Sequence, residues 1–243
     1  MRALRALVVS LLLLGSSVPR PLQAESAIGA LVHSVVLVAL VLGVEDSKTQ
    51  ECYLEYGEIG SGVIIYRKDK KYYILTTFHL LRSFLNLPKN ITPMHFIAIG
   101  PDIDHKKIKF SQSFVIAAES KKDLLLFIVT RENLLAPKIA KRASRSASRG
   151  KNVLAIGNPG SIQFFFSKGV ISGTHKEEDK ELIISDVEIS PGSSGGPLFN
   201  SSGELTGLVV GGITTSQIFG RVATIAISIE DINEFLGRYL PKD

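Results

Sequence analysis

The sequence predicts an all-β protein with two β-rich halves and a helix at the C-terminus. Short runs of β-branched and aromatic residues recur along the chain, and turns that contain glycine separate them. Segments with a helical period are rare before the C-terminal end. The 243 residues suffice for one large domain or two small ones, and 45% hydrophobic with 21% charged residues is typical of a globular protein rather than a disordered chain.

The first 24 residues have the layout of a secretory signal peptide. Arg2 and Arg5 precede an apolar run from Ala6 to Val18, and a polar, proline-containing segment ends at Ala24. The run is shorter than the about 20 residues that a membrane-spanning helix needs, so a signal peptide is favoured over a permanent anchor. We expect an exported protein, periplasmic or secreted, that begins near Glu25. Much of the formal charge of +5 leaves with this segment, so the basic composition predicts no nucleic-acid partner.

Residues 26–44 form a second apolar run, interrupted only by His33 and Ser34. Its length alone would suffice to span a bilayer. Valine recurs throughout the run, however, and the chain then leads through the glycines at 60–62 into another strand-like segment. We expect a turn at 60–62 and a first barrel strand within 26–44, with a membrane helix as the alternative. Membrane association would use residues 6–18 or 26–44.

A basic segment separates two groups of predicted strands. Residues 137–151 carry six lysines and arginines among serines and alanines, without an apolar period or interleaved aromatic residues. This favours a solvated surface linker over a basic patch for nucleic acid or an anionic membrane. It divides the chain into an N-terminal half, 25–136, and a C-terminal half, 152–243. The expected strands are 63–66, 72–76, 95–99, 108–116 and 124–130, then 153–156, 164–166, 170–172, 182–189, 205–210 and 222–227.

Residues 228–240 predict the C-terminal helix. Ser228 and Asp231 have the spacing of a capping box, in which the first side chain accepts from the backbone N–H three residues later. Ile229, Ile232 and Phe235 recur at helical spacing and form one apolar face.

The segment 191–198, PGSSGGPL, carries the most specific chemical signal. A nucleophilic serine needs an exposed hydroxyl and backbone N–H groups aimed at the developing oxyanion. Gly192 permits the backbone conformation and close substrate approach that this requires, and the glycines after Ser194 keep side chains out of the cleft. A structural Gly/Ser turn is the alternative, but this combination after a strand is rare. We predict Ser194 as a nucleophile.

The same residues fit the G-x-S-x-G turn of α/β-hydrolases, which the rest of the sequence contradicts. In that fold the serine leads into a helix and the histidine comes last in the chain. Here Pro197 follows, a strand is expected after it, and all five histidines precede Ser194. The order histidine, aspartate, serine remains.

Six segments together resemble the trypsin-like peptidases, and within them the HtrA/Deg-type bacterial peptidases. The resemblance runs from about Ile28 to the C-terminal helix. It implies two packed antiparallel six-stranded β-barrels of the chymotrypsin type and serine endopeptidase activity on proteins or peptides, with no metal or cofactor. We expect none of the PDZ modules that follow the peptidase domain in many relatives, and no oligomeric state is predicted. The matching segments are 60–65 (GSGVII), 74–80 (ILTTFHL), 122–128 (KDLLLFI), 153–159 (VLAIGNP), 185–186 (SD) and 191–198.

By this resemblance His79 is the base, Asp123 orients its imidazole, and the N–H groups of Gly192 and Ser194 form the oxyanion hole. The residues themselves agree with these roles. His79 ends a strand-like run, and Asp123 directly precedes an apolar strand that can bury and hold it.

Two positions depart from the pattern of the family. Phe78 stands where the family has a small residue, so its ring must find space or displace His79. This keeps open a catalytically silent module that binds extended peptides or a protein partner. Ser193 stands where related enzymes carry Asn or Asp, which excludes activation by pairing a new N-terminus with an aspartate at that position.

Glu188, Val209 and Val210 are the candidates for substrate binding. Glu188 lies six residues before Ser194, the offset at which trypsin-like enzymes place the base of the S1 pocket. An acidic base would favour lysine or arginine at P1. Val209 and Val210, which by the same resemblance help to form the pocket wall, suit a small apolar P1 instead. The cost of an unpaired buried carboxylate also favours Glu188 at the rim.

Overall fold

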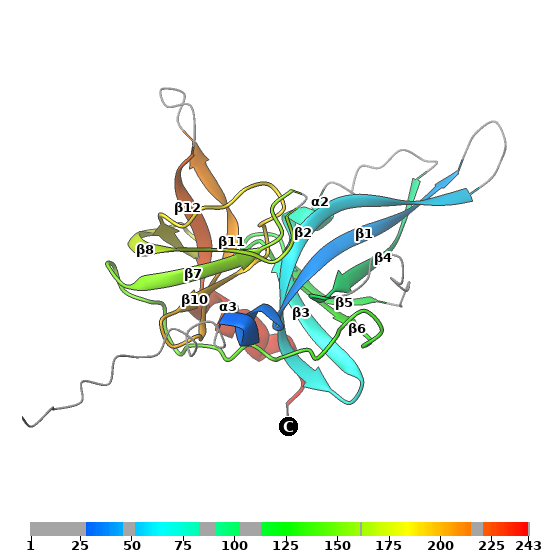
Figure 1. The fold of residues 1–243 in the computed structure, drawn as a ribbon, viewed down its shortest axis with the longest axis horizontal. Coiled ribbons are helices and arrows are strands. Elements are labelled where there is room, and N and C mark those ends of the chain that lie inside the picture. The colour runs from blue at the N-terminus through cyan, green and yellow to red at the C-terminus, as the bar shows by residue number, and fades with distance from the viewer. Residues whose placement is uncertain are drawn as a thin grey trace, which may run out of the picture.

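A computed structural model describes residues 28–45, 52–82, 91–102, 113–160, 162–214 and 221–242. It contains two antiparallel six-stranded sheets that stand side by side, with a helix where they meet (Figure 1). The predicted all-β chymotrypsin-like class is confirmed. The signal-peptide prediction for residues 1–24 lies outside the described residues.

The N-terminal sheet is a half-barrel with the strand order β4-β1-β2-β3-β6-β5. It differs from the closed barrel expected, because β4 and β5 end the order and do not pair with each other in the described residues. The prediction of a strand from residue 108 falls partly outside the described residues. The strands are β1 (Val35–Glu45), β2 (Cys52–Lys68), β3 (Lys71–Thr77), β4 (Ile91–Ile99), β5 (Phe114–Glu119) and β6 (Leu124–Val129).

The apolar run at 26–44 contains strand β1, which confirms the strand interpretation. β1 pairs with β2 on one side and β4 on the other, so its backbone groups are satisfied within the sheet. No helix in the described parts of the chain is long and apolar enough to cross a membrane.

The predicted turn at 60–62 is wrong, because these residues lie inside β2. A Cβ on Gly62 would lie 2.8 Å from the side chains of Ile74 and Val38. Glycine at this position therefore permits close packing of neighbouring strands rather than a reversal of the chain.

The C-terminal sheet closes into a barrel with the order β10-β11-β12-β9-β8-β7. The two runs predicted at 164–166 and 170–172 belong to one strand, β8. The strand predicted at 182–189 ends at Ser185, and the chain leaves the sheet before the Ser194 loop. The strands are β7 (Asn152–Gly157), β8 (Phe165–Lys176), β9 (Glu181–Ser185), β10 (Pro197–Asn200), β11 (Leu205–Thr214) and β12 (Arg221–Ser228).

Successive side chains of a strand point to opposite faces of its sheet. Apolar side chains therefore form separate cores, one inside each sheet and one between the two sheets. Along β2, Ile64 points into the N-terminal half-barrel, whereas Val63 and Ile65 point into the core shared with the C-terminal half. That shared core also contains Phe199 of β10 and Phe235 of the terminal helix. The two halves are therefore packed against each other through this shared core.

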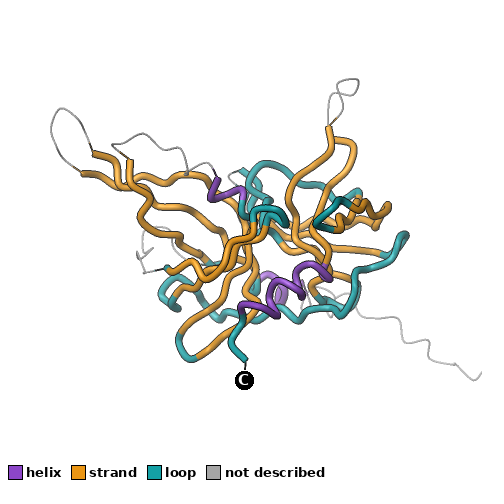
Figure 2. Tube along the Cα trace, turned by 180° about the vertical axis from the view of Figure 1, so that it is seen from behind, coloured by secondary structure: helices purple, strands orange, loops and turns teal. Residues whose placement is uncertain are grey.

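The helix α3 (Ile229–Tyr239) begins at the predicted cap, because the Ser228 side chain accepts from the Asp231 N–H. Its apolar face is buried in the shared core, and Figure 2 shows it where the two sheets meet. Among the described residues, three ion pairs join it to the N-terminal half: Lys122 with Asp231 and with Glu234, and Glu119 with Arg238.

The basic segment at 137–151 runs between the sheets and is held by its backbone. The N–H groups of Lys138 and Ala140 donate to the carbonyls of His33 and Ile64 in the N-terminal half. Ala143 N–H donates to the carbonyl of Leu205 in the C-terminal half. The six basic side chains of the segment are exposed to solvent.

Candidate active site

His79 and Asp123 lie at the same end of two paired strands. β3 ends at Thr77, β6 begins at Leu124, and these two residues face each other in the ladder. His79 follows β3 as the first residue of the short helix α2 (His79–Arg82), and Asp123 directly precedes β6. The sheet register therefore sets the two side chains opposite each other.

The contact between His79 and Asp123 uses both carboxylate oxygens. Asp123 Oδ2 lies 2.8 Å from His79 Nδ1, and Oδ1 accepts from the His79 backbone N–H at 2.7 Å. The two side chains are 32% and 19% exposed, so the pair is shielded but reachable from solvent. With Nδ1–H as the donor, the opposite ring nitrogen, Nε2, is an acceptor.

The backbone of Asp123 is held in the left-handed region, with φ of 57°. Aspartate tolerates this region better than most residues. Its carbonyl accepts from the Phe78 N–H at 3.0 Å, so the turn is fixed from the His79 side as well. The preceding residue, Lys122, is buried and its ammonium contacts Asp231 at 2.7 Å and Glu234 at 2.6 Å.

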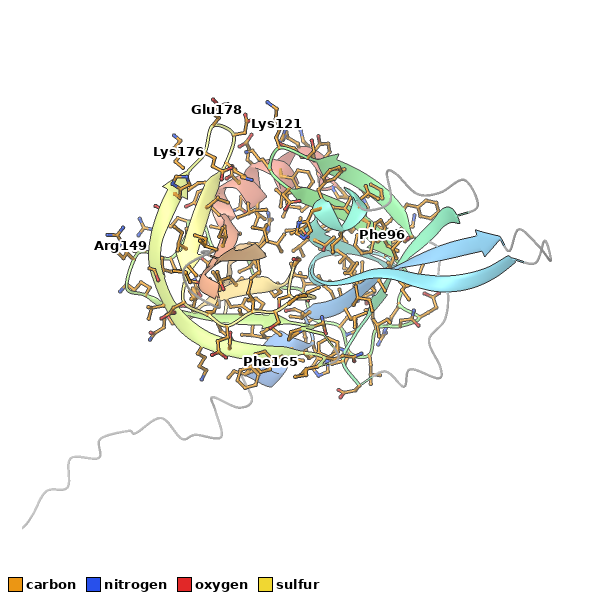
Figure 3. The ribbon with its side chains drawn as sticks, turned by 90° about the horizontal axis from the view of Figure 1, so that it is seen from above. Phe96, Lys121, Arg149, Phe165, Lys176 and Glu178 are labelled. Atoms are coloured by element: carbon orange, nitrogen blue, oxygen red, sulfur yellow. The ribbon has the colours of Figure 1, made fainter. Side chains whose placement is uncertain are left out.

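The electrostatics of Lys122 follow from these contacts. Burial by itself lowers the pKa of Lys122, but the hydrogen bonds to Asp231 and Glu234 and the attraction of both carboxylates hold the pKa above the ordinary lysine value. The hydrogen bond from Lys122 also lowers the pKa of the Glu234 carboxyl. The neighbouring Lys121 pairs with Asp179 at 3.1 Å, in the turn that carries Glu178 (Figure 3).

Phe78 does not displace His79 from Asp123. Its side chain is only partly buried, and its backbone joins the turn by donating to Asp123 and accepting from the Leu81 N–H. The ring has thus found space beside the site without breaking the His79–Asp123 contact.

Ser194 lies on the loop between β9 and β10 and contacts strands β2 and β11. Its carbonyl accepts from the Ser61 N–H of β2 at 2.8 Å, and its hydroxyl lies 3.4 Å from the Val210 carbonyl of β11. A Cβ on Gly60 would lie 2.5 Å from Leu80 Cδ1 and 3.1 Å from the Ser194 carbonyl oxygen. The helix that carries His79 and the Ser194 loop therefore meet at Gly60. Within the described residues, no hydrogen bond joins Ser194 to His79 itself.

Several N–H groups of the loop around Ser194 are used in backbone hydrogen bonds, including those of Ser193, Gly195 and Gly196. Ser193 N–H donates to the Ser190 carbonyl at 2.9 Å, and Gly195 N–H donates to the Val209 carbonyl at 2.8 Å. The N–H groups of Gly192 and Ser194 have no acceptor among the described residues. Two unpaired donors in one short loop can bind a developing negative charge.

Two glycines make this loop conformation attainable. Gly192 has φ of 98° and Gly195 has φ of 83°. A Cβ on Gly192 would lie 2.3 Å from the Asn158 carbonyl oxygen, and one on Gly195 would lie 2.1 Å from the Ser61 carbonyl oxygen. Both positions therefore require glycine for dihedral angle and for space.

The predicted substrate-binding residues lie around the same loop, with different exposures. Glu188 is exposed, Val210 is partly exposed, and Val209 is only 1% exposed. Glu188 and Val209 line a narrow cavity of about 10 Å³ together with Phe165. Glu188 and Phe165 also line an open hollow of about 440 Å³.

Sequence reasoning missed three residues of the site. Phe165, at the edge of the C-terminal barrel in Figure 3, lines both hollows beside Glu188. Ser61 and Asn158 are buried; the Ser61 hydroxyl donates to the Gly192 carbonyl of the Ser194 loop and accepts from the Asn158 N–H. GSG at 60–62 predicts a turn and GNP at 157–159 belongs to a segment of the family resemblance, so neither pattern indicated a role for Ser61 or Asn158. Among the described residues no group of three or more metal-ligating side chains is found.

Comparison with known proteins agrees with this geometry. Residues 60–208 match the trypsin-like peptidase domain. The chain is 33% identical to "Protease Do-like 1, chloroplastic" of Arabidopsis thaliana over 157 residues, 61% of this chain and 32% of that protein. It is 29% identical to a "Probable periplasmic serine endoprotease DegP-like" of Marinomonas over 170 residues, 67% of this chain and 30% of that protein. It is 29% identical to "Serine endoprotease DegS" of Haemophilus influenzae over 194 residues, 77% of this chain and 52% of that protein.

The chain spans about a third to a half of the length of these relatives. The domain match covers more than half of this chain, and it includes the histidine, aspartate and serine segments described above. The chain belongs to the trypsin-like peptidase family and is of the HtrA/Deg type.

Proposed function

We propose that this chain is a serine endopeptidase that hydrolyses peptide bonds in proteins or peptides with Ser194 as the nucleophile. The observation that carries the proposal is the His79–Asp123 contact at 2.8 Å, beside a loop whose Gly192 and Ser194 N–H groups have no acceptor among the described residues. The relatives named above as endoproteases support the same activity.

The side chains and the backbone N–H groups of the site have separate roles in the reaction. His79 Nε2 takes the proton of the Ser194 hydroxyl as its oxygen attacks the peptide carbonyl carbon. Asp123 keeps the proton on Nδ1 and stabilises the imidazolium that forms. The carbonyl oxygen becomes an oxyanion and accepts from the N–H groups of Gly192 and Ser194.

The covalent acyl-enzyme intermediate then forms and is hydrolysed. The C–N bond breaks, the leaving amine takes the proton from His79, and an acyl ester remains on Ser194. Water attacks this ester while His79 takes one of its protons, and collapse of the second oxyanion returns the proton to Ser194 and releases the acid. The hydrogen bond between nucleophile and base is often long in an unliganded peptidase and tightens when substrate binds.

A small apolar side chain at P1 suits the residues around Glu188. The carboxylate of Glu188 reaches solvent, where it keeps its hydration, and Val209 presents a buried apolar wall. Recognition of a basic P1 by Glu188 is the competing proposal.

We further propose that the chain is exported after cleavage near Ala24. The signal-peptide pattern of residues 1–24 supports this, as do relatives whose names describe periplasmic proteases. Mass spectrometry of the protein recovered after expression in a bacterium tests it, since a mature chain beginning near Glu25 is expected. An intact N-terminus at Met1 would overturn the proposal.

Labelling with a fluorophosphonate probe tests the activity. An activated Ser194 forms a covalent adduct, so the wild-type protein is labelled, whereas Ser194→Ala is not. Peptide-library cleavage by the wild-type protein, with the same variant as the control, then identifies the P1 residue. Binding of peptides without labelling or cleavage would instead indicate a catalytically silent module that holds extended segments in the same cleft.

A further inference from the structure

Ser61 connects the N-terminal sheet to the loop that carries Ser194. It lies on β2 and is completely buried. Its backbone N–H donates to the Ser194 carbonyl at 2.8 Å, and its carbonyl accepts from the Thr76 hydroxyl at 2.7 Å. The N–H and the carbonyl of Ser61 are thus both held by hydrogen bonds, independently of its side chain.

Only one orientation of the Ser61 hydroxyl satisfies the hydrogen-bonding groups around it. It lies 2.8 Å from the Gly192 carbonyl, 2.9 Å from the Asn158 backbone nitrogen and 3.1 Å from Asn158 Nδ2. Both Asn158 groups are donors, so the hydroxyl oxygen accepts from them and its single proton points at the Gly192 carbonyl. All three hydrogen-bonding positions of the hydroxyl are used.

Asn158 is fixed as firmly as Ser61. It is 1% exposed, and its Nδ2 also lies 3.2 Å from the Val36 carbonyl of β1. Its Oδ1 accepts from the Phe164 N–H at 3.0 Å. The donors that orient the Ser61 hydroxyl therefore cannot turn away without breaking further buried hydrogen bonds.

These bonds determine which way the peptides around Gly192 face. The Gly192 carbonyl is held by Ser61, and the N–H of the same peptide, on Ser193, donates to Ser190. The carbonyl of the preceding peptide, on Pro191, accepts from the Gly160 N–H at 2.8 Å. Because C=O and N–H point in opposite directions in a trans peptide, the Gly192 N–H is turned away from Gly160.

Glycine at 192 makes an external restraint necessary. With φ of 98° and no Cβ, Gly192 has access to several other backbone conformations. Rotation about its bonds would turn its N–H away from the position where it can meet an oxyanion. Gly192 has no side chain that could oppose this rotation, so the hydrogen bonds from neighbouring segments must restrict it.

We propose that Ser61 is a positioning residue for the oxyanion hole: its hydroxyl, oriented by Asn158, holds the Gly192 peptide in the conformation that binds the transition state. The inference rests on the proposed peptidase function. Ser61 contacts neither substrate nor the reacting atoms, so its removal acts on the transition state through Gly192 and leaves substrate binding in the ground state unchanged.

Kinetics of Ser61→Ala test the proposal. Direct loss of an oxyanion-hole donor costs about 10²- to 10³-fold in kcat. Loss of the restraint should cost less, about 10- to 100-fold, with KM unchanged, because the donor remains but is held less firmly. The affinity of a peptide aldehyde, which places an oxyanion in the same position, should fall by the same factor, while the affinity of the matching product peptide stays constant.

Ser34→Ala is the matched control. Ser34 is also a buried serine, 1% exposed, whose hydroxyl donates to a backbone carbonyl, that of Leu31 at 2.6 Å. Its bond lies away from the Ser194 loop, so the variant should keep the kcat and aldehyde affinity of the wild type. Equal effects of Ser34→Ala and Ser61→Ala, or an equal loss of aldehyde and product affinity, would overturn the inference.

Two further results separate this inference from the proposed function. If the wild-type protein is not labelled by a fluorophosphonate, the peptidase proposal fails, and the inference fails with it. If the wild type is labelled and Ser61→Ala is labelled equally fast, only the inference fails. Ser61→Cys covers the case in which Ser61→Ala does not fold, because a thiol fills the space but is a weak donor, and it should show the same loss of kcat and aldehyde affinity.

Discussion

Lys122 and Asp231 form an ion pair that joins the loop of the N-terminal sheet before Asp123 to the C-terminal helix, with Nζ 2.7 Å from Asp231 Oδ1. Asp231 Oδ2 also accepts from the Glu181 N–H of β9 at 2.6 Å. One carboxylate therefore ties the residue next to Asp123 to both the helix and the second barrel.

Lys122→Met should destabilise the protein by about 1–3 kcal/mol. Removal of one partner of a buried pair costs about 3–5 kcal/mol. We expect a smaller loss of stability here, because the second carboxylate that Lys122 contacts, that of Glu234, is 60% exposed and regains its hydration. Urea unfolding measures the change. Lys122→Met combined with Asp231→Asn should be less destabilising than the sum of the two single variants, since the double variant leaves no buried unpaired charge. Strict additivity would contradict the coupling.

Stability should fall at alkaline pH because of the same lysine. A pKa raised in the folded state contributes stability that is complete below the pKa of the unfolded chain, about 10.4, and is lost as pH rises through the folded value. Unfolding free energies between about pH 9 and 11.5 measure this loss. Lys122→Met serves as the control and should show a smaller slope than the wild type in this range; identical slopes would exclude Lys122 as the source.

Ser194→Ala and His79→Ala should each abolish turnover while the fold is retained. Members of such a triad act as one unit, so either change should lower kcat by at least about 10⁴-fold. Both side chains are partly exposed and contribute little packing, so the melting temperature should change little. Peptide hydrolysis and circular dichroism are measured on the same samples. Turnover at the wild-type rate in either variant would end the assignment.

Glu188→Ala distinguishes the two P1 proposals. For a small apolar P1, the variant should cleave peptides with Val or Ala at P1 at nearly the wild-type kcat/KM, because the carboxylate of Glu188 already faces solvent. Matched peptides with Lys or Arg at P1 should be poor substrates for both proteins. Efficient cleavage after Lys or Arg by the wild type, lost in Glu188→Ala, would instead establish an acidic pocket.

Gly192→Ala should impair both stability and turnover, whereas Gly237→Ala should stabilise the protein. A Cβ at 192 would meet the Asn158 carbonyl oxygen at 2.3 Å, and φ of 98° is strained for alanine. Gly237 lies in α3 with open space around it, so alanine there should add about 0.5–1 kcal/mol. Thermal unfolding compares the two variants. A neutral effect of Gly192→Ala would contradict the loop conformation described above.

Local patterns in the sequence determined most of the architecture. Periodicity and β-branched residues predicted β3, β6, β7 and β12 near their observed bounds, because strand formation follows side-chain alternation. The cap at Ser228 was predicted for the same reason, since capping depends on residues only three apart. The motif around His79 and the one around Asp123 each indicated one side chain of the contact that the register of β3 and β6 then brings together.

Tertiary contacts decided what those patterns could not. Glycines at 60 and 62 read as a turn by composition, yet they lie in β2 because the side chains of Ile74, Val38 and Leu80 fill the space where a Cβ would be. The hydroxyl of Ser61 meets Gly192 from a position 131 residues earlier in the chain, a distance over which local periodicity carries no information. Lys122 reaches Asp231 across 109 residues in the same way. The sequence by itself thus predicted which residues carry the proposed chemistry, while packing between the two halves decided which buried groups contact them.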